Sequence, residues 1–378
     1  MVSLDTAGTR SASFFALLGG LALMVGCGSS HKSGGSNNNN NGDGGGASEG
    51  DAGSASLGAC VSADTKACNS FAYPLEDGGM QPIQLGQYGA QMDVNVGNGF
   101  ENTVQSTDTP PMPNPGCQAF AAIFGEPAGI TNMLLQTSMN GVTIDFSLYS
   151  VYRPAVWPKG PVPVITWGNG TCAQPEGYGA LLRYVASYGY VIVAANSRQV
   201  GMKNSDGSQP MLKALDFAAA ANMDSKSPYY QHLDMTKVGA MGHSQGGGAT
   251  ITASTDPRIQ DIFVFNGGLS ATKPFVVLSG DMDVLNTSPS AMASSVNGAS
   301  APGAWLYYHD PAGVGMIRGH LVLMLTPDRV TDQTVSWWEM VFRNDPTAKA
   351  KFVGSSCGFC GHAMDSANAY EFGEHGLM

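Results

Sequence analysis

The chain has 378 residues and a formal net charge of −11, with 43% hydrophobic and only 12% charged residues. This length and hydrophobic share suffice for a sizeable core in one large domain or two ordinary ones. The negative charge argues against nucleic acid or an anionic membrane surface as the main partner, so we expect no nucleic-acid partner.

Residues 1–27 are expected to be a signal peptide rather than part of the fold. Arg10 precedes residues 11–26, an uncharged, largely apolar run that is short for a transmembrane helix and typical of a secretory signal. The run ends at Cys27 and resembles a bacterial lipobox, although Met24 stands where leucine is usual. We therefore expect lipidation of Cys27. An ordinary cleaved signal with an incidental cysteine is the alternative.

Residues 28–58 are predicted to be a flexible tether. They are rich in Gly, Ser and Asn, and residues 36–46 read SNNNNNGDGGG. Such a segment buries too little apolar surface to offset the entropy of ordering it. Behind a lipid anchor it would hold a domain clear of the membrane. We therefore expect a secreted protein of the cell envelope, anchored to the outer membrane or cell surface, with a tolerated low-complexity insertion as the alternative.

Six further cysteines agree with export, because an even number of cysteines in an exported chain indicates disulfides. They are Cys60, Cys68, Cys117, Cys172, Cys357 and Cys360. Six cysteines allow 15 pairings, and the sequence does not choose among them. The Cys357-Gly-Phe-Cys360 segment suits a redox motif or half a zinc site, but the context that either needs is not visible. We expect a structural disulfide there.

From about residue 140 onward, short apolar runs alternate with helical patterns. Continuous apolar strands alternating with helices predict a mostly parallel central sheet with helices on both faces. We expect one α/β domain over residues 59–378, although residues 59–140 show little pattern. The expected strands are 142–152, 162–167, 190–195, 237–241, 261–265, 274–279 and 304–308, and the expected helices are 179–188, 211–223, 246–254 and 331–344.

A nucleophile motif lies between an expected strand and the helix that follows it. The sequence Gly242-His243-Ser244-Gln245-Gly246 fits G-x-S-x-G, which forms a nucleophile elbow at a strand-to-helix turn. The small flanking residues let the neighbouring chain pass close to a strained serine. Ser244 is therefore the predicted catalytic nucleophile, and a glycine-rich turn with an incidental serine is the alternative.

The catalytic acid and base should follow the serine along the chain in that order. Asp283 follows the strand 274–279 in a Gly-x-x-Asp turn, and Asp281 is the runner-up, which would otherwise hold the turn. His320 lies on a loop after the strand 304–308, where it can reach the site, whereas His309 directly follows that strand. We predict Asp283 as the acid and His320 as the base.

The oxyanion hole requires two backbone N–H donors. We expect one from Gln245, directly after the serine, and one from Thr171 in a loop where Gly170 permits a tight turn. A plain glycine turn is the alternative for that loop. In such a site the serine forms an acyl-enzyme, and water then hydrolyses it to release the carboxylic acid. This chemistry implies no metal or organic cofactor.

Several segments resemble those of a known family. ITWGNGTC, GALLRYVASYGYVIVAANS, VGAMGHSQGGGAT and VVLSGDMDV are similar to bacterial polyester hydrolases of the cutinase and PET-hydrolase type, and to chlorophyllase-like and dienelactone-hydrolase-like esterases. The resemblance covers about residues 149–340. It implies the α/β-hydrolase fold and a serine esterase that acts on carboxylic esters. The site residues that it implies are Ser244, Asp283, His320, Thr171 and Gln245.

One departure from that family bears on the substrate. Polyester hydrolases tend to carry an aromatic platform after the strand that follows the elbow helix, and Asn266-Gly267-Gly268 stands there instead. The side chains expected near the cleft offer no clamp for an anionic substrate: Trp167, Tyr178, His243 and Phe265. We expect a small or medium uncharged ester. The alternatives are a polyester substrate, an acyltransferase or peptidase of the same fold, and a non-catalytic surface-binding protein.

Overall fold

The computed structural model describes residues 70–74, 80–97, 138–139, 142–171, 173–196, 208–269, 271–281, 283, 287–309, 319–360 and 370–378. All of them fall within Ser56–Met378, one of the two units into which the chain divides. The predicted signal peptide, the tether and Cys27 lie outside the described residues, as do Cys60, Cys68, Cys117 and Cys172. Within the described part of the chain, no helix has the length and apolar character needed to span a membrane.

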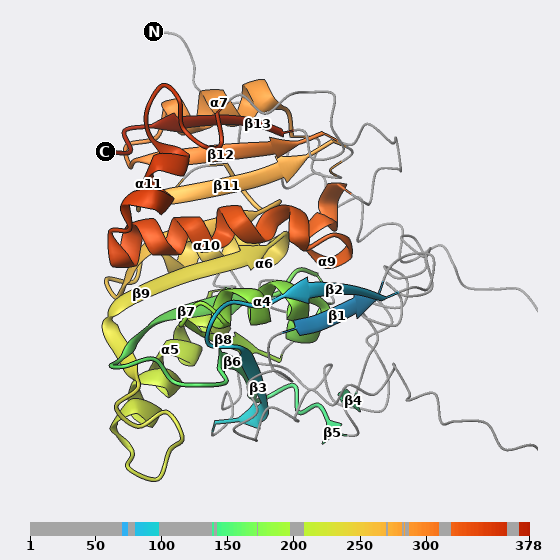
Figure 1. The fold of residues 1–378 in the computed structure, drawn as a ribbon, viewed down its shortest axis with the longest axis vertical. Coiled ribbons are helices and arrows are strands. Elements are labelled where there is room, and N and C mark those ends of the chain that lie inside the picture. Colours follow the sequence, from blue (N-terminus) through green and yellow to red (C-terminus); the bar gives the residue numbers. More distant parts are fainter. Residues whose placement is uncertain are drawn as a thin grey trace, which may run out of the picture. The chain divides into compact units, whose positions relative to one another are not determined.

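A nine-stranded sheet forms the centre of this unit (Figure 1). Its order is β13-β12-β11-β10-β9-β7-β8-β6-β3. Strands β7 to β12 run parallel, whereas β6, β3 and β13 pair antiparallel at the two ends, which confirms the predicted mostly parallel sheet. The strands are β3 (Ala90–Val96), β6 (Tyr149–Pro154), β7 (Val162–Gly168), β8 (Val191–Ala195), β9 (Leu233–His243), β10 (Ile259–Phe265), β11 (Phe275–Gly280), β12 (Gly303–Tyr308) and β13 (Tyr370–His375).

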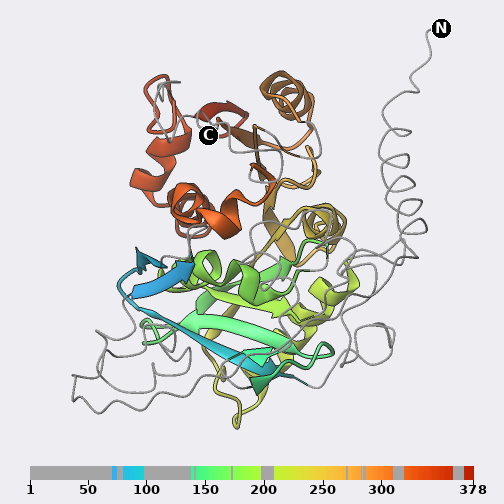
Figure 2. The ribbon, with the colours of Figure 1, turned by 90° about the vertical axis from the view of Figure 1, so that its right-hand side faces the viewer.

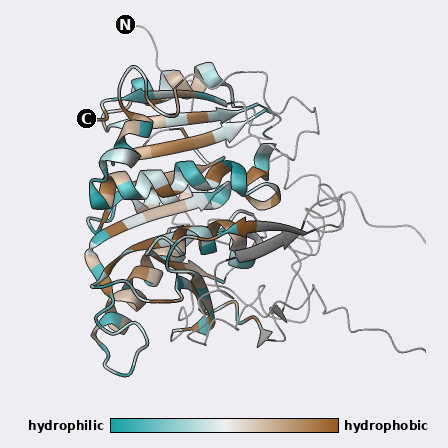
Figure 3. Ribbon diagram, in the orientation of Figure 1, coloured by the Kyte–Doolittle hydropathy of each residue, from teal (hydrophilic) through white to brown (hydrophobic). Residues whose placement is uncertain are grey.

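The central strands have continuous apolar sequences because helices cover both faces of the sheet. Every residue of β7, β8, β11 and β12 is buried. A strand buried on both faces needs no polar alternation, so sequences such as VIVAA result. Figure 3 shows the hydrophobic colouring along these strands. Two short hairpins lie outside the sheet: β1 (Ser70–Pro74) with β2 (Met80–Gln84), and β4 (Ser138–Met139) with β5 (Val142–Thr143).

The helices divide between the two faces (Figure 2). One hydrophobic cluster includes side chains of α4 (Gly179–Ala186), α9 (Val322–Leu325), α10 (Asp328–Arg343) and α11 (Pro346–Phe352). The other cluster includes side chains of α5 (Gln209–Met223), α6 (Gln245–Ala253) and α7 (Pro289–Asn297). A 3₁₀ helix, η3 (Pro175–Tyr178), precedes α4. The predicted cover of helices on both faces is therefore confirmed.

The helix α10 shows how the sequence selects the buried face. Val330, Thr334, Trp337 and Trp338 are all buried, and they recur at the spacing of one helical face. Burying two tryptophans removes several hundred Å² of side-chain surface from water, at roughly 150–250 Å² each. This face anchors α10 on the sheet and explains the amphipathic pattern of the predicted helix 331–344.

One predicted strand is wrong in its extent. The sequence predicted a single strand over 142–152, but β5 ends at Thr143 and β6 begins at Tyr149. Between them, the Asp145 carboxylate accepts hydrogen bonds from the N–H and hydroxyl of Ser147, at 2.9 and 2.6 Å. This local side-chain turn competes with extended backbone and breaks the strand. Among the described elements, those without a predicted counterpart are β1, β2, β3, β4, η3, α7, α9, α11 and β13.

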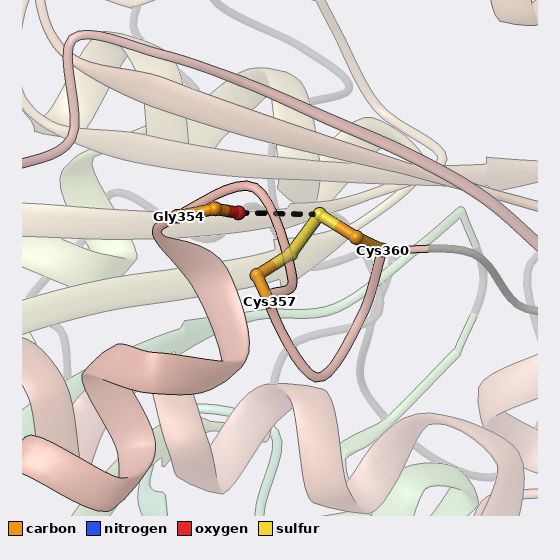
Figure 4. The surroundings of a disulfide bond; sticks show 3 residues. All are labelled: Gly354, Cys357 and Cys360. Carbon is orange, nitrogen blue, oxygen red and sulfur yellow. Dashed lines mark hydrogen bonds between the residues drawn. A yellow bond between two sulfur atoms is a disulfide. The ribbon is translucent and has the colours of Figure 1, made fainter.

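A disulfide joins Cys357 to Cys360, so a structural bridge is present in this segment as expected, and the structure supplies the pairing that the sequence left open (Figure 4). It closes the turn after α11, where the Cys360 sulfur lies 3.8 Å from the carbonyl oxygen of Gly354. Phe359, between the two cysteines, packs edge-on against Phe352 of α11 with ring centroids 4.9 Å apart. The bridge and this aromatic contact together fix the chain that follows α11.

Candidate active site

Ser244 occupies a strained turn between β9 and α6. Its backbone has φ 54° and ψ −117°, in a region that non-glycine residues seldom adopt. Its N–H donates to the carbonyl oxygen of Phe265 at 2.8 Å, and its own carbonyl accepts from the N–H of Gly248 at 3.1 Å. Hydrogen bonds on both sides hold the strained residue in place, as a nucleophile elbow requires.

Two glycines allow the chain to pack closely around this turn. A Cβ atom on Gly246 would overlap the carbonyl oxygen of Gly168, and one on Gly267 would overlap the carbonyl oxygen of Ser244. Gly246 therefore lets α6 start against the end of β7. Gly267 likewise lets the chain after β10 pass close to the carbonyl of Ser244. This close packing against the elbow explains why no aromatic residue stands at position 267.

The structure brings Ser244, His320 and Asp283 into one series of hydrogen bonds. His320 Nε2 lies 2.8 Å from Ser244 Oγ, and His320 Nδ1 lies 2.8 Å from Asp283 Oδ1. The residues come from three places: the end of β9, the loop after β11, and the chain after β12. His320 and Asp283 are buried. The order nucleophile, base, acid in space matches the arrangement of a catalytic triad.

The second carboxylate oxygen of Asp283 is held by two further donors. Its Oδ2 accepts from Asn266 Nδ2 at 2.6 Å and from Ser279 Oγ at 2.7 Å. Asn266 Nδ2 also lies 3.4 Å from the carbonyl oxygen of Gly319, beside the histidine. Hydrogen bonds to the charged form stabilise a buried carboxylate. The sequence analysis did not predict either of these hydrogen bonds, since it considered Asn266 only as part of a stretch that lacks an aromatic residue.

The two runner-up residues contact each other instead of the serine. His309 Nδ1 lies 3.1 Å from Asp281 Oδ2, and His309 Nε2 lies 2.9 Å from Glu371 Oε1. His309 follows β12 directly, and Glu371 belongs to the neighbouring strand β13. With both ring nitrogens engaged by carboxylates, His309 has none to offer to Ser244.

The loop after β7 carries Thr171 beside the start of α6. Thr171 Oγ1 donates to Gln245 Oε1 at 3.0 Å, so the side chains of the two expected oxyanion donors contact each other. Gln245 is the first residue of α6, where backbone N–H groups have no intrahelical acceptor. Asn169 fixes the loop, because its amide accepts from Trp167 Nε1 at 2.9 Å and donates to the carbonyl of Ala195 at 2.7 Å.

A second buried histidine lies directly beneath the site. His243 precedes the serine, and its Nε2 lies 2.7 Å from the carbonyl oxygen of His320. Its Nδ1 lies 3.0 Å from the hydroxyl of Tyr178, which accepts the N–H of Gly170 at 3.0 Å. Burial, reinforced by the nearby His320 ring, lowers the pKa of His243 to about 3. The ring is therefore neutral at ordinary pH.

The expectation about the cleft surface is wrong. The four side chains taken to lie near the cleft are all buried, with at most 2% exposed: Trp167, Tyr178, His243 and Phe265. Trp167 instead packs against Tyr178 and Phe265, with ring centroids 4.8 and 6.1 Å apart. These side chains belong to the core rather than to an exposed surface, so they do not indicate the substrate's charge.

Comparison with known protein families agrees with the fold. Residues 159–301 match the sequence model of a PET hydrolase-like family, PETase. The matched span contains Ser244, Asp283, Thr171 and Gln245, while His320 lies beyond its end. The mostly parallel sheet and the elbow are those of an α/β-hydrolase. The chain thus resembles the PET hydrolase-like α/β-hydrolases, and this likeness indicates an enzyme that hydrolyses ester bonds.

Proposed function

We propose that the protein is a serine esterase that hydrolyses carboxylic esters through an acyl-enzyme on Ser244. The observation that carries the proposal is the continuous series from Ser244 Oγ through His320 to Asp283, with both hydrogen bonds at 2.8 Å. His320 Nε2 can accept the serine proton while Nδ1–H donates to Asp283. Asp283 thereby fixes the ring and stabilises the imidazolium that forms.

The proposed reaction has two halves that mirror each other. Ser244 Oγ bonds to the ester carbonyl carbon while its proton passes to His320, and the carbonyl oxygen becomes an oxyanion. The carbon–oxygen bond to the alcohol then breaks, and His320 protonates the leaving alcohol. Water repeats the sequence on the acyl-enzyme: His320 takes its proton, the carboxylic acid leaves, and Ser244 regains its hydroxyl.

The oxyanion is proposed to bind the N–H groups of Thr171 and Gln245. Gly170 N–H donates to Tyr178, so it is engaged elsewhere, which favours the next residue in the loop. The Thr171–Gln245 side-chain bond supports a fixed spacing between the two backbone donors. Preorganised donors of this kind are worth about 10²–10³ in kcat each.

The substrate is proposed to be a small or medium ester, with a polyester as the second candidate. The family match supports ester chemistry of the polymer-degrading type. Against it, the tight packing of Gly267 on the elbow leaves no aromatic platform there to stack on a flat polymer ring. Loss of such stacking costs about 1 kcal/mol, roughly a factor of five in affinity, which weakens polymer binding without forbidding it.

The protein is also proposed to be exported and held at a membrane by a lipid on Cys27. The apolar run that ends at this cysteine, followed by a polar tether, supports the proposal. Mass spectrometry of the protein from its native membrane fraction should find a lipid-modified Cys27 as the first residue. Another N-terminus, or full solubility without detergent, would refute the anchor.

A fluorophosphonate probe tests the esterase proposal. Wild-type protein should label at one serine and hydrolyse p-nitrophenyl butyrate, and Ser244→Ala should abolish both. Ser290→Ala is the matched control, because Ser290 lies exposed on α7. Turnover of the Ser244→Ala variant above a few per cent of wild type would disprove the nucleophile. A wild-type protein that does not label would indicate a non-catalytic binding protein.

A further inference from the structure

The buried pair His243 and Tyr178 has no part in the reaction proposed above, although it contacts two components of the site. A backbone carbonyl can only accept, so the 2.7 Å contact with the His320 carbonyl places a proton on His243 Nε2. The neutral ring then accepts at Nδ1 from the Tyr178 hydroxyl. Tyr178 Oη in turn accepts from Gly170 N–H. All three bonds therefore have a defined direction.

This series of bonds connects three separate segments of the chain. Gly170 belongs to the proposed oxyanion loop after β7, His243 ends β9 beside the nucleophile, and His320 follows β12. Tyr178 and His243 are 1% and 2% exposed, so bulk water does not compete for their hydrogen bonds. The His243 ring also packs against the His320 ring, with centroids 4.7 Å apart.

We propose that Tyr178 and His243 form a positioning relay. By this we mean that their hydrogen bonds fix the oxyanion loop and the backbone of His320 in position relative to Ser244. The relay rests on the proposed esterase function and explains why a histidine precedes the serine. His243 fixes the carbonyl of the same residue whose ring contacts Ser244, so it sets the approach of the base to the nucleophile. Displacement by about 1 Å of a group in such a site can cost about 10²-fold in rate.

The hydrogen bonds of the relay limit which side chains can replace His243. That side chain must donate to one carbonyl and accept from one hydroxyl, in a fully buried space. Glutamine can do both, since its amide carries a donor and an acceptor, whereas leucine fills similar space without either. The conservative and the apolar substitution therefore separate hydrogen bonding from packing.

The test measures kcat, KM and thermal stability for four variants with p-nitrophenyl butyrate. Tyr178→Phe and His243→Leu should lower kcat by about 10- to 100-fold with KM changed by less than about threefold, because the chemistry is misaligned rather than the binding. His243→Gln should restore most of the activity. Tyr190→Phe is the matched control, because Tyr190 is also buried and donates to Glu339. Tyr190 precedes β8, at the amino ends of the parallel strands, whereas the site lies at their carboxyl ends.

Hydrogen exchange of the Gly170 amide supplies a readout that does not depend on catalysis. Exchange should accelerate in Tyr178→Phe and stay at the wild-type rate in Tyr190→Phe. The relay is overturned if folded Tyr178→Phe keeps kcat within about twofold of wild type, or if His243→Gln loses as much activity as His243→Leu. If His243→Leu fails to fold, Tyr178→Phe decides. Wild-type protein without fluorophosphonate labelling would count against the esterase proposal instead.

Discussion

Two histidine–aspartate pairs lie near the ends of β11 and β12, and their aspartates are only two residues apart in the chain. In the first pair, His320 and Asp283 are 8% and 0% exposed at their side chains. In the second, His309 and Asp281 are 18% and 36% exposed. Both pairs join a ring Nδ1 to a carboxylate oxygen, at 2.8 and 3.1 Å.

The pairs differ in what the second ring nitrogen contacts. His320 Nε2 contacts the hydroxyl of Ser244, which has a proton to give. His309 Nε2 contacts a carboxylate oxygen of Glu371 and not a hydroxyl group. The first arrangement suits proton transfer. The second, formed by His309, Asp281 and Glu371 and called here the His309 clamp, joins the ends of β11, β12 and β13. The group that contacts the second ring nitrogen of the histidine therefore determines the role of each histidine–aspartate pair.

The largest contrast is expected between the two histidines. His320→Ala should lower kcat for p-nitrophenyl butyrate by at least about 10³-fold, because no group remains to take the serine proton. His309→Ala should keep kcat within about threefold, because the clamp does not touch the reacting groups. Steady-state kinetics on both purified variants check this. Inactivation by His309→Ala alone would mean that the base has been assigned to the wrong histidine.

The two aspartates should differ nearly as much. Asp283→Asn should lower kcat by about 10³- to 10⁴-fold, because an amide in place of the carboxylate favours the wrong tautomer of His320. Asp281→Asn should leave kcat nearly unchanged. Circular dichroism serves as the control for folding in both variants. Equal losses of kcat from the two substitutions would show that contact with His320 does not identify the catalytic acid.

A smaller effect is expected from the support of the acid. Ser279→Ala removes one hydrogen bond to Asp283 Oδ2 and leaves the one from Asn266 in place. A hydrogen bond to a charged group is worth about 1.5–3 kcal/mol, so we expect kcat to fall by about 10- to 100-fold. Ser290→Ala on the surface of α7 is the matched control. An unchanged kcat would mean that the hydrogen bond from Ser279 is not needed to hold Asp283 in place.

The buried His243 makes the stability of the fold depend on pH. Burial lowers the folded pKa of His243 to about 3 from its ordinary value of 6.5, so the unfolded chain binds this proton first as pH falls. Its contribution to stability is complete above about pH 6.5 and is lost toward pH 3, at up to about 1.4 kcal/mol per pH unit. Urea unfolding at several pH values should show a shallower acid slope in His243→Gln. An identical slope would contradict the neutral buried ring.

The smallest effect concerns the clamp itself. His309→Ala removes contacts to Asp281 and Glu371 that are partly exposed to solvent. Because solvent screens partly exposed pairs, we expect a loss of only about 1 kcal/mol in the free energy of unfolding. Chemical denaturation measures this loss. A loss of several kcal/mol would show that the clamp, and not the hydrophobic sheet, secures β13.

Sequence reasoning could reach the sheet because its strands are buried on both faces and therefore read as continuous apolar runs. The elbow was visible because a serine in a strained turn needs small neighbours, as at Gly246. Strand limits were harder: β9 runs over Leu233–His243, beyond the expected 237–241, because its first residues are partly polar. The strand predicted across Asp145 was wrong because a side-chain hydrogen bond, invisible to periodicity, makes a turn there.

The supporting contacts of the site could not be found in the same way. Tyr178 and His243 are 65 residues apart, and Asn266 and Asp283 are 17 apart, so nothing local in the chain links them. Tyr178 also has the aromatic character of an ordinary core residue, and burial gives no hint of its hydroxyl partner. Only the register of the parallel strands brings these groups together at one edge of the sheet.

The central claim, a covalent acyl intermediate on Ser244, is tested most directly by rapid acid quench during hydrolysis of p-nitrophenyl butyrate. Intact mass and peptide mapping should find one butyryl group on the peptide that carries Ser244, formed together with a burst of nitrophenol. The burst and the adduct should both be absent in Ser244→Ala. Steady hydrolysis with no burst and no adduct, or an adduct on another residue, would contradict the account.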